Sequence, residues 1–159
     1  MADFDAGFKI AAHHSGRGLT QLAGIATDKW ERIVDTLQTT ERLADRAFRA
    51  KDGTDRFVVY MEAYTRWVDS APWSVLAKSG LLSERERLPT RSLIFVLLPT
   101  GYKPQNNTFR LAVGQEATQQ VWFREIPLWE QAPEPWWEKH PGLMALYPLC
   151  QHGQDLTER

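Results

Sequence analysis

The sequence predicts a single α/β domain. Apolar residues recur at helical spacing in some segments, whereas β-branched and aromatic residues form short runs in others. These segments follow the order helix, strands, helix and central strand, which favours an α/β architecture. The length of 159 residues fits one domain with one core.

The first fifty residues contain patterns of more than one kind. Residues 3–14 have a helical spacing of apolar side chains, and the glycine-containing segment 15–18 is expected to end this first helix. Residues 19–25 then suit a second, short turn of helix. Residues 28–50 carry a partial helical stripe, but their threonines and apolar alternation suit strands. Taken alone, this pattern favours a helix.

The remaining segments have clearer patterns. A turn is expected at residues 51–55, where Asp-Gly is a hairpin signal. The apolar run 91–98, bounded by prolines, is typical of a central strand buried on both faces. The other expected elements are a strand at 56–64, a helix from 69–73 to about residue 87, a hairpin of strands at 108–113 and 119–126, and a Trp- and Pro-rich extension at 127–159 that packs on the domain.

Composition narrows the class of function and the location. The net charge is −1, from 19 basic and 20 acidic residues, which argues against a protein that coats nucleic acid non-specifically. It leaves room for a local basic patch beside an acidic metal site. Cys150 is the single cysteine, and no signal-peptide or membrane-spanning pattern is visible. We therefore expect a cytoplasmic protein with no membrane contact.

Two acidic residues are candidates for chemistry. Glu62 lies in an otherwise apolar strand, where a carboxylate is costly to bury unless it is paired or binds a cation. If residues 42–50 also form a strand, Asp45 can stand across from Glu62 on the face that Tyr64 shares. Two carboxylates on neighbouring strands suit a hard divalent ion such as Mg²⁺. Alternatively, Asp45 is a surface hairpin residue and Glu62 pairs with an arginine at position 46, 56 or 66.

Four stretches of the chain carry a family resemblance. They are Phe-Asp-Ala-Gly-Phe-Lys at 4–9, Leu-Ala-Asp-Arg-Ala-Phe-Arg at 43–49, the apolar strand 57–64 that ends in Glu-Ala-Tyr, and the segment 123–135 around Leu-Trp-Glu. In this order, they resemble the PD-(D/E)XK nuclease superfamily, in particular its bacterial recombination-promoting nuclease and transposase-like branch. The likeness spans about residues 4–149.

The resemblance has implications for both fold and function. It implies a restriction-endonuclease-like core, with a mixed central sheet of about five strands flanked by helices. Within that core, residues 32–38 and 43–50 become strands, against the pattern of the residues alone. It also implies Mg²⁺-dependent hydrolysis of DNA phosphodiesters, with Mn²⁺ able to substitute.

Site roles also follow from the resemblance. Asp45 and Glu62 become metal ligands, and Tyr64 occupies the third position, which is usually Lys or Gln. A tyrosine hydroxyl carries no charge at neutral pH, so this departure predicts a weakened or absent activity. Lys9 in the opening motif could supply the missing charge. The alternative is a non-catalytic nuclease-fold protein that serves in interaction or in assembly of a homo-oligomer.

Overall fold

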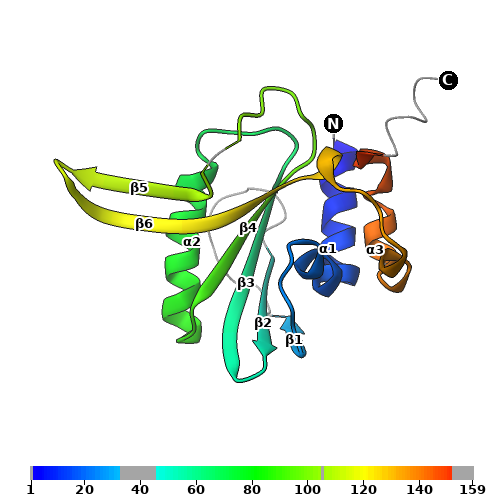
Figure 1. Ribbon diagram of the computed structural model, residues 1–159, viewed down its shortest axis with the longest axis horizontal. Helices are drawn as coiled ribbons and strands as arrows, with labels where there is room; N and C mark the ends of the chain where they lie inside the picture. Colours follow the sequence, from blue (N-terminus) through cyan, green and yellow to red (C-terminus); the bar gives the residue numbers. More distant parts are fainter. Residues whose placement is uncertain (1, 33–45, 105, 152–159) are drawn as a thin grey trace.

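A mixed, open sheet organises the computed structural model, which describes residues 2–32, 46–104 and 106–151 (Figure 1). Six strands of these residues lie in the order β1-β2-β3-β4-β6-β5. Neighbours in β1, β2 and β3 are antiparallel, β3, β4 and β6 are parallel, and β5 is antiparallel to β6. The strands are β1 (Lys29–Arg32), β2 (Arg46–Asp52), β3 (Asp55–Tyr64), β4 (Thr90–Val96), β5 (Thr108–Val113) and β6 (Glu116–Pro127).

Helices cover both faces of this sheet. Alternate residues of a strand point to opposite sides, so β3 contributes Val59 and Met61 to one apolar cluster and Val58 and Tyr60 to the other. The first cluster contains α1 (Ala2–Leu22), and the second contains α2 (Ala71–Glu86). Figure 1 shows the two helices on opposite sides of the strands. The expected α/β class, with a mixed sheet flanked by helices, is confirmed.

The central strand β4 lies between β3 and β6 and is buried on both faces, as its continuous apolar run predicts. The helix predicted to end near residue 87 is also present as α2, which ends at Glu86. Its N-cap residue, Ser70, makes no side-chain capping hydrogen bond, and a proline occupies the first turn as expected.

The helix favoured for residues 28–50 is wrong in the described part of that range, because β1 and β2 lie at its two ends. The predicted strand 32–38 lies outside the described residues beyond Arg32. Trp30 and Phe48, which contribute to the apparent helical stripe, stack across the two strands with ring centroids 4.4 Å apart. Their apolar surface is therefore buried by cross-strand pairing, which a single-segment pattern cannot represent.

The predicted break in the first helix is present at Ser15, where φ is −135° and ψ is 31°, so α1 consists of two helical parts. The second part ends at Leu22, three residues before the predicted end. Gly16 and Gly18 also serve close packing: a Cβ on either would lie 2.7 Å from Phe48 or His140, respectively. Small residues here let other elements approach the helix.

The C-terminal segment packs against α1. It contains 3-10 helices at Leu128–Glu130, Pro135–Lys139 and Tyr147–Leu149, together with α3 (Pro141–Met144). Trp137 and Leu143 are buried in the cluster that α1 contributes to, and the Gly142 amide donates a hydrogen bond of 2.8 Å to Ser15 Oγ. The apolar residues of this segment therefore complete the core on that face.

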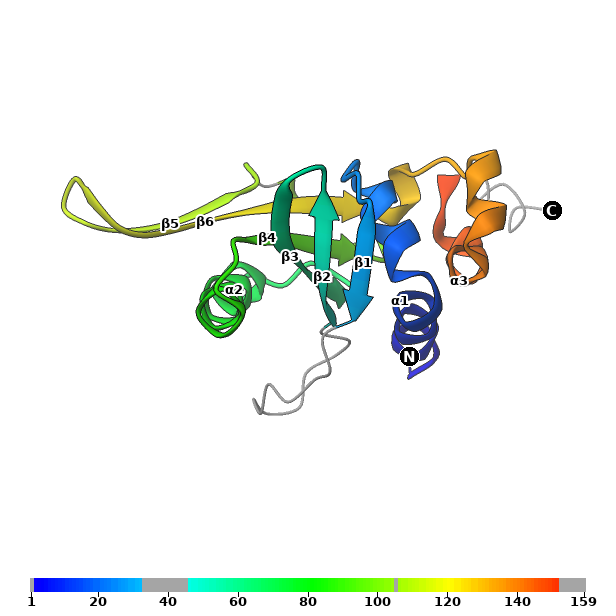
Figure 2. The same cartoon turned by 90° about the horizontal axis from the view of Figure 1, so that it is seen from below.

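The β5–β6 hairpin extends away from the body of the domain (Figures 1 and 2). Strand β6 begins at Glu116, earlier than the predicted residue 119, and its first five residues are exposed. Among the described helices, none combines the length and apolar composition that spanning a bilayer requires.

The β2–β3 turn provides a test of local conformation. Gly53 has a φ of +57°, which is costly for residues with a Cβ. We expect Gly53→Ala to lower the free energy of unfolding by about 1 kcal/mol in urea denaturation. The control is Gly80→Ala in α2, where a Cβ meets nothing within 4 Å and φ is helical. Gly80→Ala should raise the free energy of unfolding by about 0.5–1 kcal/mol. Equal effects of the two substitutions would contradict the positive φ at Gly53.

Candidate functional site

Glu62 is the centre of a buried polar cluster between β3 and α2. It lies on the strand face that Val58 and Tyr60 share, and the residue is only 3% exposed. Ser74 Oγ donates to its Oε1 at 2.6 Å, and Lys78 Nζ donates to the same oxygen at 2.7 Å. Ser74 and Lys78 are four residues apart on α2, which places both side chains on one helix face.

The Glu62–Lys78 contact is a buried ion pair. The exposed fractions of the two side chains are 4% and 12%. Glu62 therefore takes its cation from α2, not from the arginines at positions 46, 56 and 66 that its sequence neighbourhood suggested. Lys78 follows Val75 by three residues on the buried side of this helix, and a lysine in such a position is a signal that could have identified it.

The structure brings together some of the residues predicted from sequence. Tyr64 lies two residues along β3 and donates its hydroxyl hydrogen bond to Glu62 Oε2 at 3.0 Å. Lys9 belongs to α1, on the other side of the sheet from Glu62. Asp45 lies outside the described residues. In the structure it is Lys78 that puts positive charge next to Glu62, the role the sequence analysis offered to Lys9.

A second carboxylate lies on the same sheet face. Ile94 is in register with both Glu62 and Glu125, so it stands between them. Tyr102 donates a hydrogen bond of 2.7 Å to Glu125 Oε2. Burial, with a further contribution from this carboxylate, raises the pKa of Tyr102 well above its ordinary value. Each of the two glutamates is therefore held by its own tyrosine, an arrangement that sequence reasoning did not anticipate.

Comparison with known proteins finds no matching family model, no matching curated protein and no matching solved structure. The nuclease resemblance of the four sequence stretches therefore stays a prediction. Function has to be argued from the geometry and chemistry of the site.

The chemistry of Glu62 fits a single contact to a metal ion. Within the described part of the chain, no three His, Cys, Asp or Glu side chains are grouped closely enough to hold an ion. An ionised carboxylate has about four acceptor positions. Donors from described residues use two positions on Oε1 and one on Oε2. A metal ion at Glu62 would therefore need most of its ligands from other groups.

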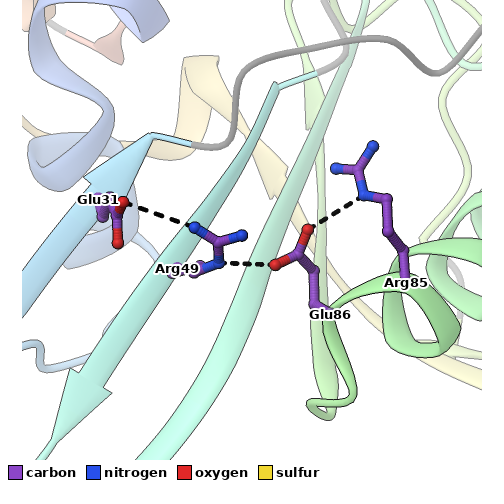
Figure 3. A network of polar contacts seen from close by, with 4 residues as sticks. All are labelled: Glu31, Arg49, Arg85 and Glu86. Carbon is purple, nitrogen blue, oxygen red and sulfur yellow. Dashed lines mark hydrogen bonds and ion pairs between the residues drawn. The ribbon is translucent and has the colours of Figure 1, made fainter.

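A separate network joins the end of α2 to β1 and β2 (Figure 3). Glu86 accepts from Arg49 at 2.6 Å and from Arg85 at 3.0 Å, while Arg49 also reaches Glu31 at 3.5 Å. Burial alone would raise the pKa of Glu86, but the hydrogen bonds and charges of the two arginines outweigh it and lower the pKa. The network is structural, because it anchors the last turn of the helix to the sheet.

We expect Glu62→Leu to destabilise the protein by about 3–5 kcal/mol, because it removes the carboxylate of a buried ion pair and places an apolar side chain beside the Lys78 ammonium. The double variant Glu62→Leu/Lys78→Met removes both charges and should recover most of this loss in urea denaturation. The exposed Glu138→Leu serves as a control with little effect. A double variant no more stable than the single one would show that the two charges are not energetically coupled.

Protonation of Glu86 should weaken the fold in acid. Its folded-state pKa lies below the ordinary 4.5, so its contribution to stability is present above about pH 4.5 and is lost as the pH falls through the folded-state value. The difference in Tm between the wild type and Glu86→Gln should therefore be largest near neutral pH and shrink in acid. The exposed Glu84→Gln gives the comparison. A constant Tm difference from pH 7 to pH 3 would contradict the role of this carboxylate.

Proposed function

We propose that the chain is a metal-dependent DNA phosphodiesterase with a restriction-endonuclease-like core. In this proposal Glu62 and Asp45 are Mg²⁺ ligands, and Lys78 supplies the charge that Tyr64 lacks. The observation that carries it is the buried carboxylate of Glu62, with an ammonium group 2.7 Å away. Burying such a pair often stabilises a protein no better than apolar residues of similar volume, which supports a functional reason for its presence.

The donors around Glu62 suit this chemistry. A bound Mg²⁺ would supply Lewis acidity toward a phosphodiester and lower the pKa of water. Lys78 would stabilise the negative charge that develops on the phosphate, as a fixed cation in a site with little water. Tyr64 and Ser74 hold the carboxylate in place through their hydroxyl hydrogen bonds. The protein thus supplies a positioned ligand and a nearby cation.

The architecture is compatible with this proposal. A mixed sheet with helices on both faces is the coarse form of the core that the resemblance implies. The β2–β3 ladder is described as far as the pair Arg46–Met61, next to Glu62 in sequence. The proposal keeps Asp45 as the second ligand from the resemblance, and its substitution is therefore a necessary part of the test.

One observation favours the non-catalytic alternative. Glu62 is 3% exposed and already has three protein donors, which is also how a purely structural carboxylate is satisfied. In that case the nuclease-like fold would serve in interaction or homo-oligomeric assembly. The two functions differ in whether metal and DNA bind and in the mass of the protein in solution.

Cleavage of plasmid and linear DNA with Mg²⁺ or Mn²⁺ tests the proposal. We expect Glu62→Gln, Asp45→Asn and Lys78→Met each to lower the cleavage rate by about 100-fold or more, because each removes a charge from the site. Lys103→Met, an exposed lysine, is the matched control and should cleave at the wild-type rate. Circular dichroism establishes that each variant is folded.

Calorimetry with Mn²⁺ adds a measurement that does not depend on turnover. The affinity for Mn²⁺ should fall in Glu62→Gln and Asp45→Asn but stay at the wild-type value in Lys78→Met. Cleavage that survives Glu62→Gln would come from another centre. A folded wild type that binds neither Mn²⁺ nor DNA but forms a stable oligomer would support the non-catalytic alternative.

A further inference from the structure

A row of like charges crosses one end of the sheet. Lys29 on β1 is in register with Lys51 on β2, and Lys51 is in register with Arg56 on β3. Residues paired in this way share a sheet face, and like charges directly opposite one another destabilise the pairing. Three neighbouring cations therefore repel one another, and a bound anion would relieve that repulsion.

This row adjoins a series of cavities that share lining residues and extend from the α2 face of the sheet to the α1 face, where Arg91 and Arg124 lie. A cavity of about 660 Å³ contains it and shares Arg56 with a cavity of about 270 Å³. A third cavity, of about 350 Å³, shares Arg91 with the second. A fourth cavity, of about 380 Å³, shares Gly24 and Ile25 with the third. The basic groove is defined here by the cations that line these four cavities: Lys29, Arg49, Lys51, Arg56, Arg91, Arg124 and Arg17.

The positive charge of the groove is mostly uncompensated. Its lining contains two carboxylates, Glu31 and Asp55, and Glu31 is already paired with Arg49. Among the described residues, the other six cations of the groove have no ion pair. Because the whole chain carries a net charge of −1, this concentration of positive charge is local. Such a surface attracts a polyanion.

Several of these cations are held in position without being neutralised. Arg17 donates to the carbonyl of Thr27 at 2.7 Å, and Arg124 donates to the carbonyl of Ala23. The guanidinium of Arg91 lies 4.6 Å from the centre of the Phe57 ring. These contacts fix the guanidinium groups, so less side-chain entropy is lost when a ligand binds them.

An aromatic side chain suits this groove to bases as well as phosphates. Trp122 is 65% exposed and lines the same cavity as Arg91 and Arg124. Positively charged grooves with exposed aromatic side chains bind single strands, because each unpaired base offers a face for stacking.

We propose that the basic groove binds single-stranded nucleic acid, with its phosphates along the cations and a base stacked on Trp122. Part of the groove lies at the opposite end of β3 from the candidate catalytic cluster: Arg56 and Glu62 are six residues apart, which is about 20 Å along an extended strand. Arg91 and Arg124 are in register with Val59 and Leu93, so they lie on the α1 face of the sheet, whereas Glu62 lies on the α2 face. The groove is therefore a binding site separate from Glu62, and its occupation does not require cleavage.

The test measures binding in EDTA, so that metal-dependent cleavage plays no part. Fluorescence anisotropy would follow a labelled single strand of about 20 nucleotides, longer than the roughly 4–16 nucleotides that one such groove covers. The groove variant is Lys51→Gln/Arg56→Gln/Arg91→Gln. The control variant removes the same charge elsewhere, as Lys103→Gln/Arg110→Gln/Lys139→Gln. Thermal melting by circular dichroism establishes that both are folded.

We expect the groove variant to bind at least tenfold more weakly than the control variant. The slope of log K against log salt should fall in magnitude by about 2, since each phosphate contact to a single strand contributes about 0.7. Trp122→Ala should weaken binding by about tenfold, and Trp122→Phe should retain most of the affinity, because a phenyl ring still stacks.

Three outcomes would overturn the proposal. Equal losses in the groove and control variants would mean that only net charge matters. Tighter binding of the matching duplex than of the single strand would make the assigned ligand wrong. If Trp122→Ala bound the single strand as tightly as the wild type, no base would stack on Trp122 and the site would bind any polyanion. Glu62→Gln should bind the single strand normally, so failure of the nuclease proposal and failure of the groove proposal give different results.

Discussion

The buried ion pair between Glu62 and Lys78 joins β3 to α2, and much of the chemistry of this face depends on it. A carboxylate placed centrally in a sheet is tolerated only if donors reach it, and α2 provides two of them from one helix face, Ser74 and Lys78. Tyr64 provides a third from the strand itself. The position of α2 over the sheet is thus constrained by polar contacts as well as by the apolar cluster around Val58 and Tyr60.

The two ends of strand β3 lie in different electrostatic environments. Near its C-terminal end, Glu62 is enclosed, nearly dry and matched by a cation. Near its start, Arg56 and its register neighbours form an open surface of like charge. Enclosure strengthens single interactions and suits chemistry, whereas an open basic surface attracts an extended polyanion over a longer range. One sheet can therefore hold an enclosed ion pair and present a separate basic surface without either disturbing the other.

The sequence predicted correctly those elements in which the order of apolar and polar residues directly reflects which side chains are buried. The apolar run that forms β4 could be placed because a strand covered on both faces has no polar side. The period of two in β3 correctly put Glu62 and Tyr64 on one face. Residues 28–50 gave the wrong prediction at both described ends, because Trp30 and Phe48 bury their rings against each other across two strands. The glycine-containing segment 15–18 correctly indicated a break in the first helix, at Ser15, whereas the close packing at Gly16 and Gly18 could not be read from it.

By itself, the sequence determined the class of fold, the central strand and the presence of a carboxylate that needs a cation. These follow from local periodicity and from the cost of burying charge, both of which act within one segment. Only the tertiary structure decided that the cation is Lys78, that Glu125 lies one strand beyond Ile94, and that cations from several elements line adjoining cavities. These facts depend on which strands become neighbours and in what register, and pairing between distant segments leaves no periodic trace in either segment alone.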